Sequence, residues 1–289
     1  MVVREPNDDP DLDVAVTEWF RESTQPPRVG LLGPVQVTAP GSLPNHRQRV
    51  CQELIVYLAM VGDEGADAAE ISRQLWPLQP VRATVRTDVI MNVRRWLGSD
   101  AEGQPWLSEA VPDGRYRLRG GVLVDWHLFR RLRARGERRG PAGAEDLRTA
   151  LQLVRGAPLA DAHDLAEASA RPPYSWLPGS LIEPALLLAG VVDTAHQLVD
   201  LSLQSGDLDT ARWAVQQAWL ADVRRSDDHP WRDLLRIAHA EGDSGRVKTV
   251  IRELLRWRDA EHPDELGPVT RDLIRALLAQ QPTSAGERR

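Results

Sequence analysis

Cysteine is nearly absent from this 289-residue chain, and its single copy, Cys51, excludes an internal disulfide. The thiol lies at helical spacing from Leu54 and Leu58, so we expect a buried structural side chain rather than a reactive one. Phenylalanine and tyrosine are also scarce, with two and three copies against ten tryptophans. The indoles therefore supply most of the aromatic surface that can anchor packing between short elements.

Long hydrophobic runs are missing as well. The longest, residues 184–192, is far shorter than the roughly 20 apolar residues that cross a membrane. The first residues show none of the basic, apolar and small-residue sections of a secretory signal. We therefore expect a soluble, cytoplasmic protein with no membrane span in this chain.

The sequence lacks the motifs of the common enzyme classes. Its seven histidines are scattered, with no i,i+4 pair and no nearby cysteine, so no metal site is expected. A P-loop, a GxGxxG after a strand and a GxSxG elbow are all absent. We expect Asp207 and Asp209 to cap a helix rather than bind calcium, and Asp227 and Asp228 to be solvated in a turn. These absences predict a protein that is not an enzyme and needs no cofactor or metal.

Negative charge is concentrated at one end of the chain. The net charge is −6, and residues 1–27 hold seven acids and two bases, a net charge of −5. Residues 28–126 are neutral overall, which leaves room for a local basic patch. We interpret residues 1–27 as an acidic flexible leader in which "VAVTEWF" forms a short helix or docks on a partner.

Residues 28–125 show the pattern of a small mixed domain. A β-like stretch at 29–41 is followed by helical periodicity at 46–62, 67–77 and 82–98, and the second helix opens with Asp67 and Glu70 at capping-box spacing. A strand at 106–111, the turn "PDG" and the strand "RYRL" then form a hairpin. This order predicts a winged helix-turn-helix domain whose wing is the hairpin, with Asp125 capping the next helix.

From residue 126 onward the periodicity is purely helical, over 144–155, 180–204, 208–221, 230–241, 246–258 and 268–280. Residues 205–220 and 241–256 align at a period of 36, with Gly206 and Gly242 in equivalent turns. A period of this size with helix pairs is typical of tetratricopeptide-like (TPR-like) stacking. We predict a mainly α protein, with the winged-helix domain followed by a TPR-like helical domain over 126–280 and a disordered tail over 281–289.

The chain resembles bacterial regulators that join an OmpR-type winged helix to a bacterial transcriptional activator domain (BTAD), among them the antibiotic regulatory proteins of actinobacteria (SARP). The likeness rests on the segments "LGPVQV", "RQR", "ISRQLWP", "VRRWLG", "GRYRL", "VDWHLFRRL", "RGAPLAD", "SGDLDTARWAVQQAWLAD" and "DELGPVTRDLIRALL". It covers residues 28–280, and "VRRWLG" and "VDWHLF" are most similar to the branch found on envelope proteins with LysM modules. The resemblance implies transcription regulation on double-stranded DNA, with the helical domain binding a protein partner or a second copy.

The helix at 82–98 is the expected reading helix of the winged domain. One arc is apolar and is assigned to the core: Val85, Val89, Ile90, Val93, Trp96 and Leu97. The candidate DNA-binding residues lie on the opposite arc, at the N-terminal turn and on the wing: Arg82, Thr84, Arg86, Thr87, Arg94, Arg95, Arg115, Arg117 and Arg119. Asp88 and Met91 interrupt the opposite arc, because a carboxylate repels phosphate and a thioether offers no hydrogen bond to a base edge.

Two hypotheses of different classes follow. In the first, the chain is a DNA-binding regulator in which Thr84, Thr87, Arg94 and Arg95 enter the major groove and the other arginines hold phosphates. In the second, it is a non-enzymatic interaction scaffold whose winged helix no longer binds DNA, within a larger envelope-associated protein. For the leader, we weigh a solvated tail against a segment that competes with nucleic acid for the arginine-rich face.

Overall fold

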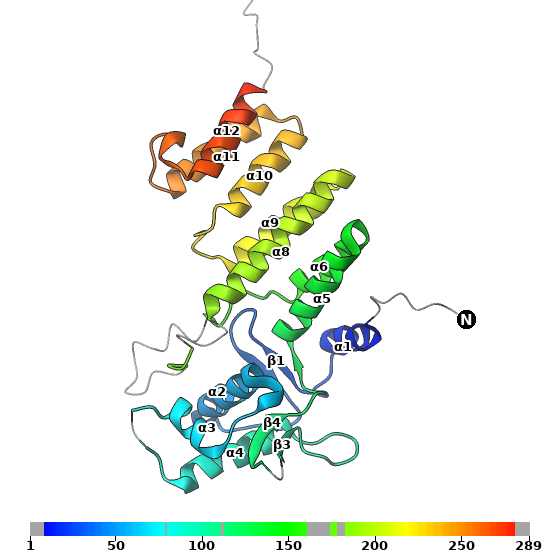
Figure 1. The fold of residues 1–289 in the computed structure, drawn as a ribbon, viewed down its shortest axis with the longest axis vertical. Coiled ribbons are helices and arrows are strands. Elements are labelled where there is room, and N and C mark those ends of the chain that lie inside the picture. The colour runs from blue at the N-terminus through cyan, green and yellow to red at the C-terminus, as the bar shows by residue number, and fades with distance from the viewer. Residues whose placement is uncertain (1–8, 79, 111–112, 161–173, 178–182, 281–289) are drawn as a thin grey trace, which may run out of the picture. The chain divides into compact units, whose positions relative to one another are not determined.

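The chain is mainly helical with small sheets, as the sequence predicts (Figure 1). A computed structural model describes residues 9–78, 80–110, 113–160, 174–177 and 183–280. Contacts divide the chain into two compact units, Met1–Gly190 and Val191–Arg289. The predicted disordered tail, 281–289, lies outside the described residues.

The first unit contains the sheets of a winged helix. Strands β1 (Arg28–Gly30), β2 (Gln36–Thr38) and β5 (Leu123–Val124) form one sheet in the order β2-β1-β5. β1 runs antiparallel to β2 and parallel to β5, so the last strand of the domain returns beside the first. β3 (Leu107–Ala110) and β4 (Arg115–Leu118) form the predicted hairpin.

Three helices lie between these strands, α2 (Asn45–Val61), α3 (Ala68–Leu75) and α4 (Ala83–Leu97), with a 3-10 turn η1 (Gly62–Glu64) after α2. The predicted capping box is present, because Asp67 accepts from the backbone of Glu70 while the Glu70 carboxylate accepts from the backbone of Asp67. The predicted buried thiol, Cys51, is inaccessible, and burial raises the pKa of that thiol to about 11.

The leader contains the short helix that the sequence allowed at "VAVTEWF". Helix α1 (Pro10–Phe20) packs on α5 (Asp125–Arg139) and buries Leu12 completely. Two of the leader's acids form ion pairs with the same helix: Asp9 lies 2.8 Å from Arg131, and Asp13 lies 2.7 Å from Arg135. An apolar anchor combined with complementary charge thus holds α1 in place. Residues 1–8 lie outside the described part.

The two compact units do not coincide with the two predicted domains. We placed the boundary between residues 125 and 126, yet α5, the short turn η2 (Gly140–Gly143) and α6 (Ala144–Gln152) belong to the first unit. After α6 the chain returns to the sheet, where the backbone N–H of Arg155 donates to Leu32 at 2.7 Å and that of Leu159 to Leu31 at 3.0 Å. Long-range contacts of this kind leave no trace in local periodicity.

Asp125 is central to this connection. It is the first residue of α5 rather than the residue that precedes it, and its buried carboxylate reaches back to accept from the backbone N–H groups of Leu31 (2.8 Å) and Leu32 (2.9 Å). Burial raises the pKa of Asp125 to about 6. The sequence correctly places Asp125 at the start of a helix, but the N–H groups that it binds lie in the loop after β1.

The second unit is built from repeated helix pairs. Helix α8 (Pro184–Ser205) runs into it and is followed by α9 (Leu208–Ala221), α10 (His229–Ala240) and α11 (Ser244–Trp257). A short turn, η3 (Pro263–Glu265), then leads to α12 (Pro268–Ala279). The 36-residue period is visible in the structure: Gly206 and Gly242 have φ of 79° and 72°, and the next residue in each case, Asp207 or Asp243, caps the helix that follows.

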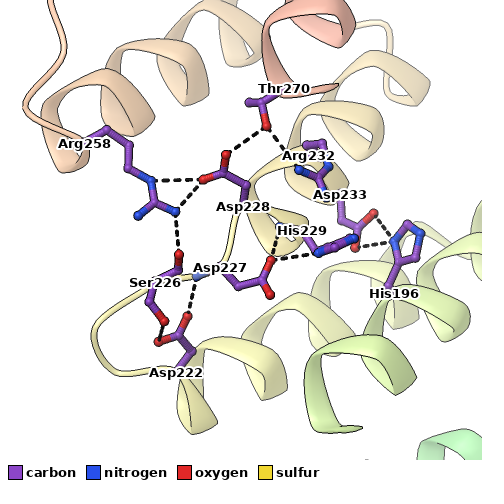
Figure 2. Close-up of polar contacts among 10 residues, drawn as sticks. All are labelled: His196, Asp222, Ser226, Asp227, Asp228, His229, Arg232, Asp233, Arg258 and Thr270. Carbon is purple, nitrogen blue, oxygen red and sulfur yellow. Dashed lines mark hydrogen bonds and ion pairs between the residues drawn. The ribbon is translucent and has the colours of Figure 1, made fainter. Parts of the chain in front are cut away.

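Polar contacts hold the turn between α9 and α10 in place (Figure 2). The Asp228 carboxylate accepts from Arg258 at the end of α11 and from the Thr270 hydroxyl in α12, both at 3.0 Å. Asp227 lies 2.8 Å from Nδ1 of His229. The expectation of solvated acids holds for Asp227, whose side chain is 37% exposed, whereas Asp228 is bound by two partners that are distant in sequence.

By length and composition alone, α8 is the one helix of the described chain that could cross a membrane. Of its most apolar window, 44% is buried, and Leu187, Val191 and Leu198 have almost no exposed surface. An apolar helix with a buried face is equally typical of a protein core, so its composition does not show a span.

Candidate nucleic-acid interface

Helices α3 and α4 form the helix-turn-helix of the first unit, and α4 is the predicted reading helix. Its inner face is buried, and five of the six predicted core residues lie there: Val89, Ile90, Val93, Trp96 and Leu97. The sixth, Val85, is 43% exposed, so its assignment to the core is wrong. Val85 lies in the first turn of α4, where the helix has not yet reached the interior.

The outer face of α4 forms one exposed stripe. Thr84, Thr87, Asp88, Met91 and Arg95 are all exposed, and their spacing of three, four, seven and eleven residues from the first keeps them on one side of a helix. Arg82, directly before the helix, is exposed too. We use the name α4 outer face for these six residues. It combines two cations, one carboxylate, two hydroxyls and a thioether.

The remaining arginines of α4 are partly covered. Arg86 donates to the Ser72 hydroxyl of α3 at 3.1 Å, and Nε of Arg94 donates to the Leu107 carbonyl of β3 at 3.2 Å. These side chains join α4 to its neighbours. Of the four arginines predicted for this helix and its first turn, Arg82 and Arg95 are the exposed ones, and Arg95 also donates to Oδ1 of Asn92 at 3.1 Å.

The wing arginines are held by internal contacts. Arg115 donates to the carbonyls of Glu64 (2.8 Å) and Gly65 (2.9 Å) and forms a 2.8 Å ion pair with Glu70. Arg117 donates to the Asp63 carbonyl at 2.7 Å and pairs with Asp113 at 2.6 Å. The Arg117 guanidinium holds the pKa of Asp113 below its usual range.

The third wing arginine, Arg119, pairs with Asp100 in the loop before β3. Its side chain is 39% exposed, against 29% for Arg115 and 26% for Arg117. We predicted that these three arginines face outward. Instead, their hydrogen bonds and ion pairs connect the hairpin to the neighbouring segments. Residues 28–126 contain as many acidic as basic residues, and this balance was the one indication in the sequence that carboxylates could pair with these arginines.

Asp9 and Asp13 of the leader form ion pairs with α5, so these two carboxylates are not bound to the arginines of α4 or the wing. The described residues contain no group of three or more His, Cys, Asp or Glu side chains arranged to hold a metal ion.

No family model and no curated protein matches the chain. Among solved structures it is similar to EmbR of Mycobacterium tuberculosis, determined in complex with a low-affinity phosphopeptide. The likeness has a TM-score of 0.63 at 18% sequence identity and covers 89% of this chain. It defines a fold in which a winged helix precedes a helical region. The chain spans 66% of the length of the EmbR chain.

Proposed function

We propose that this protein is a DNA-binding transcription regulator of the SARP/BTAD type. The observation that carries the proposal is the α4 outer face, an exposed stripe on the second helix of a helix-turn-helix. A helix in this position docks into the major groove, which is wide enough to admit it. The structural likeness to EmbR supports the architecture, and a cytoplasmic location is the one such a regulator requires.

The exposed residues differ in the roles we assign to them. Thr84, Thr87 and Arg95 are placed to reach base edges, since hydroxyl and guanidinium groups both donate there. Arg82 adjoins the free N–H groups at the start of α4, where a phosphate is stabilised. The internally bound Arg115 and Arg117 are assigned a smaller share of phosphate binding than the sequence suggested. The second unit is assigned to binding a protein partner or a second copy.

Binding to a random-sequence DNA duplex at several salt concentrations tests the proposal. Arg82→Ala is expected to weaken binding and to reduce the salt slope by about one, because a phosphate contact is lost, and Arg95→Ala is expected to weaken binding because a base contact is lost. Arg138→Ala is the matched control, since Arg138 is an exposed arginine at the far end of α5. Equal effects of all three variants would contradict a site on α4.

An interaction scaffold is the second candidate, and the observation that favours it is the pair Asp88 and Met91 in the middle of the stripe. Met91 is 45% exposed, which suits a protein contact better than a base edge. Asp88→Asn distinguishes the two functions. It should tighten duplex binding if α4 faces phosphates and leave it unchanged if the face meets protein. Absence of duplex binding by the unaltered protein at low salt would favour the scaffold.

A further inference from the structure

A hollow of about 230 Å³ lies on the outer surface of the small sheet in the first unit, away from the α4 outer face. The described residues that line it are Trp19, Arg28, Gly30, Gln36, Thr38 and Arg155. They come from α1, from β1 and β2, and from the segment after α6. Residues between 19 and 38 thus meet Arg155, which is more than 100 residues further along the chain, around one small space.

The strand register explains why the polar side chains converge. Arg28 pairs with Thr38, and Gly30 pairs with Gln36, in the antiparallel ladder of β1 and β2. Residues opposite each other share a face of the sheet, and so do residues two apart, so all four positions face the hollow. Val29 and Val37 alternate to the other face.

Gly30 provides the room for the arginine above it. A Cβ atom at this position would lie 2.1 Å from Nη2 and 2.8 Å from Cζ of Arg155, so the guanidinium rests directly on the glycine backbone. From there, Arg155 donates to the Pro34 carbonyl (3.1 Å) and to Oε1 of Gln36 (3.2 Å). Its Nε is buried and has no hydrogen-bond partner among the described residues.

The hollow is cationic. Arg28 donates to the carbonyls of Trp19 and Arg21, both at 2.6 Å, and to that of Ser23, and it pairs with no carboxylate of the described residues. Nη2 of Arg155 forms a 3.5 Å ion pair with the buried Asp125 carboxylate, which lies outside the lining. Two guanidinium groups therefore face one space whose described walls contain no acid. Thr38 contributes a hydroxyl and Trp19 an indole.

We propose that this hollow binds a small oxyanion, a carboxylate or a phosphate, whose apolar part packs on Trp19. Guanidinium groups form charge-assisted hydrogen bonds with both kinds of anion. The volume is below the roughly 300–1,000 Å³ of pockets for drug-sized molecules, so the ligand is a head group with at most one ring. The site is independent of DNA binding, since none of its residues belongs to α4.

Calorimetric titration of the whole protein with inorganic phosphate, phenyl phosphate and benzoate tests this site. We expect a dissociation constant on the order of 1 mM for inorganic phosphate and tighter binding of phenyl phosphate, whose ring contacts Trp19. Binding of phenyl phosphate alone identifies a phosphate ligand, and binding of benzoate alone identifies a carboxylate. Either result supports the oxyanion site.

Two variants at one position locate the binding. Thr38→Val removes a hydroxyl while keeping the shape of the side chain, and should weaken binding roughly three- to tenfold, as loss of one hydrogen bond does. Thr38→Glu places a carboxylate in the hollow, opposite Arg28 in the ladder, and should abolish binding while the thermal unfolding transition persists. Thr249→Val, in α11 of the second unit, is the matched control and should bind as the unaltered protein does.

Two outcomes overturn the proposal. One is the absence of binding heat with every probe at concentrations on the order of 10 mM. The other is equal binding by the unaltered protein and a folded Thr38→Glu variant, which would place the anion elsewhere. Neither measurement involves DNA. The test of this site is therefore independent of the test of the proposed regulator function.

Discussion

Asp125 shows how one side chain joins segments that are remote in sequence. Its carboxylate accepts from two backbone N–H groups after β1 and lies at the first residue of α5, and Arg155 approaches it from the segment after α6. Buried N–H groups that lose their acceptor cost more than an average hydrogen bond is worth. The stability of the first unit therefore depends on this residue far more than its single charge suggests.

Replacing Asp125 is expected to destabilise the first unit strongly. Asp125→Ala should lower the free energy of unfolding by about 3 kcal/mol, because it leaves the N–H groups of Leu31 and Leu32 buried without an acceptor. Asp125→Asn keeps one acceptor oxygen and should cost less. Urea denaturation gives both values, with the exposed Asp11→Ala as the control. A loss for Asp125→Ala as small as that for Asp11→Ala would mean that water satisfies these groups.

At the scale of elements, side-chain contacts hold the wing against η1 and the start of α3. Arg115 in β4 contacts the end of η1 and the capping box that starts α3, and Arg117 contacts η1 as well. A hairpin of two four-residue strands is marginally stable alone, so such ties determine its position. The wing thereby becomes a rigid part of the winged helix rather than a free basic arm.

Arg115→Ala separates a structural role of the wing from a DNA-binding role. We expect the free energy of unfolding to fall by about 1–2 kcal/mol, since two carbonyls and a carboxylate lose a charged donor. The salt slope of duplex binding should stay close to that of the unaltered protein. Arg138→Ala, which has neither role, should change neither quantity. The reverse pattern for Arg115→Ala, unchanged stability with a slope reduced by one, would restore the wing as a phosphate clamp.

At the scale of the whole molecule, the chain forms two compact units, and each has its own internal polar contacts. The second unit contains a histidine that links α8 to α10: Nδ1 of His196 lies 2.8 Å from the buried Asp233 carboxylate (Figure 2). Asp200 and Arg236 belong to the same cluster, and the His229 ring lies 5.4 Å from that of His196. The hydrogen bond to Asp233 raises the pKa of His196.

A raised pKa fixes the sign of the pH dependence. The protonated imidazole is favoured in the folded state, so its stabilising effect is complete below pH about 6.5, the ordinary histidine value, and is lost as the pH rises through the raised pKa. The stability difference between the unaltered protein and His196→Gln should therefore be larger at pH 5.5 than at pH 8.5.

Hydrogen exchange of individual peptides shows where that pH effect acts. Amides of α10 should lose protection in His196→Gln at the lower pH, while amides of α2 and α4 in the first unit should not change. His239→Gln is the control, because His239 is exposed on the same helix. A difference between the proteins that is independent of pH would show that His196 acts by packing alone.

The order and type of the elements follow from local chemistry, and the sequence predicts them well. Apolar spacing gave the helices of both units, and the 36-residue period gave the equivalent turns at Gly206 and Gly242 with their aspartate caps. Such features depend on residues a few positions apart, because helix hydrogen bonds and caps close within four residues.

Which charges are available at the surface depends on the folded chain. Arg115 has hydrogen-bond partners about 50 residues away, and Asp125 accepts from the N–H groups of Leu31 and Leu32 more than 90 residues back. The docking of α1 on α5 and the convergence of Arg28 and Arg155 around one hollow are equally remote in sequence. A pairing of this kind is set by which surfaces the core brings together, and periodicity along one segment contains no information about the segment that will lie opposite it.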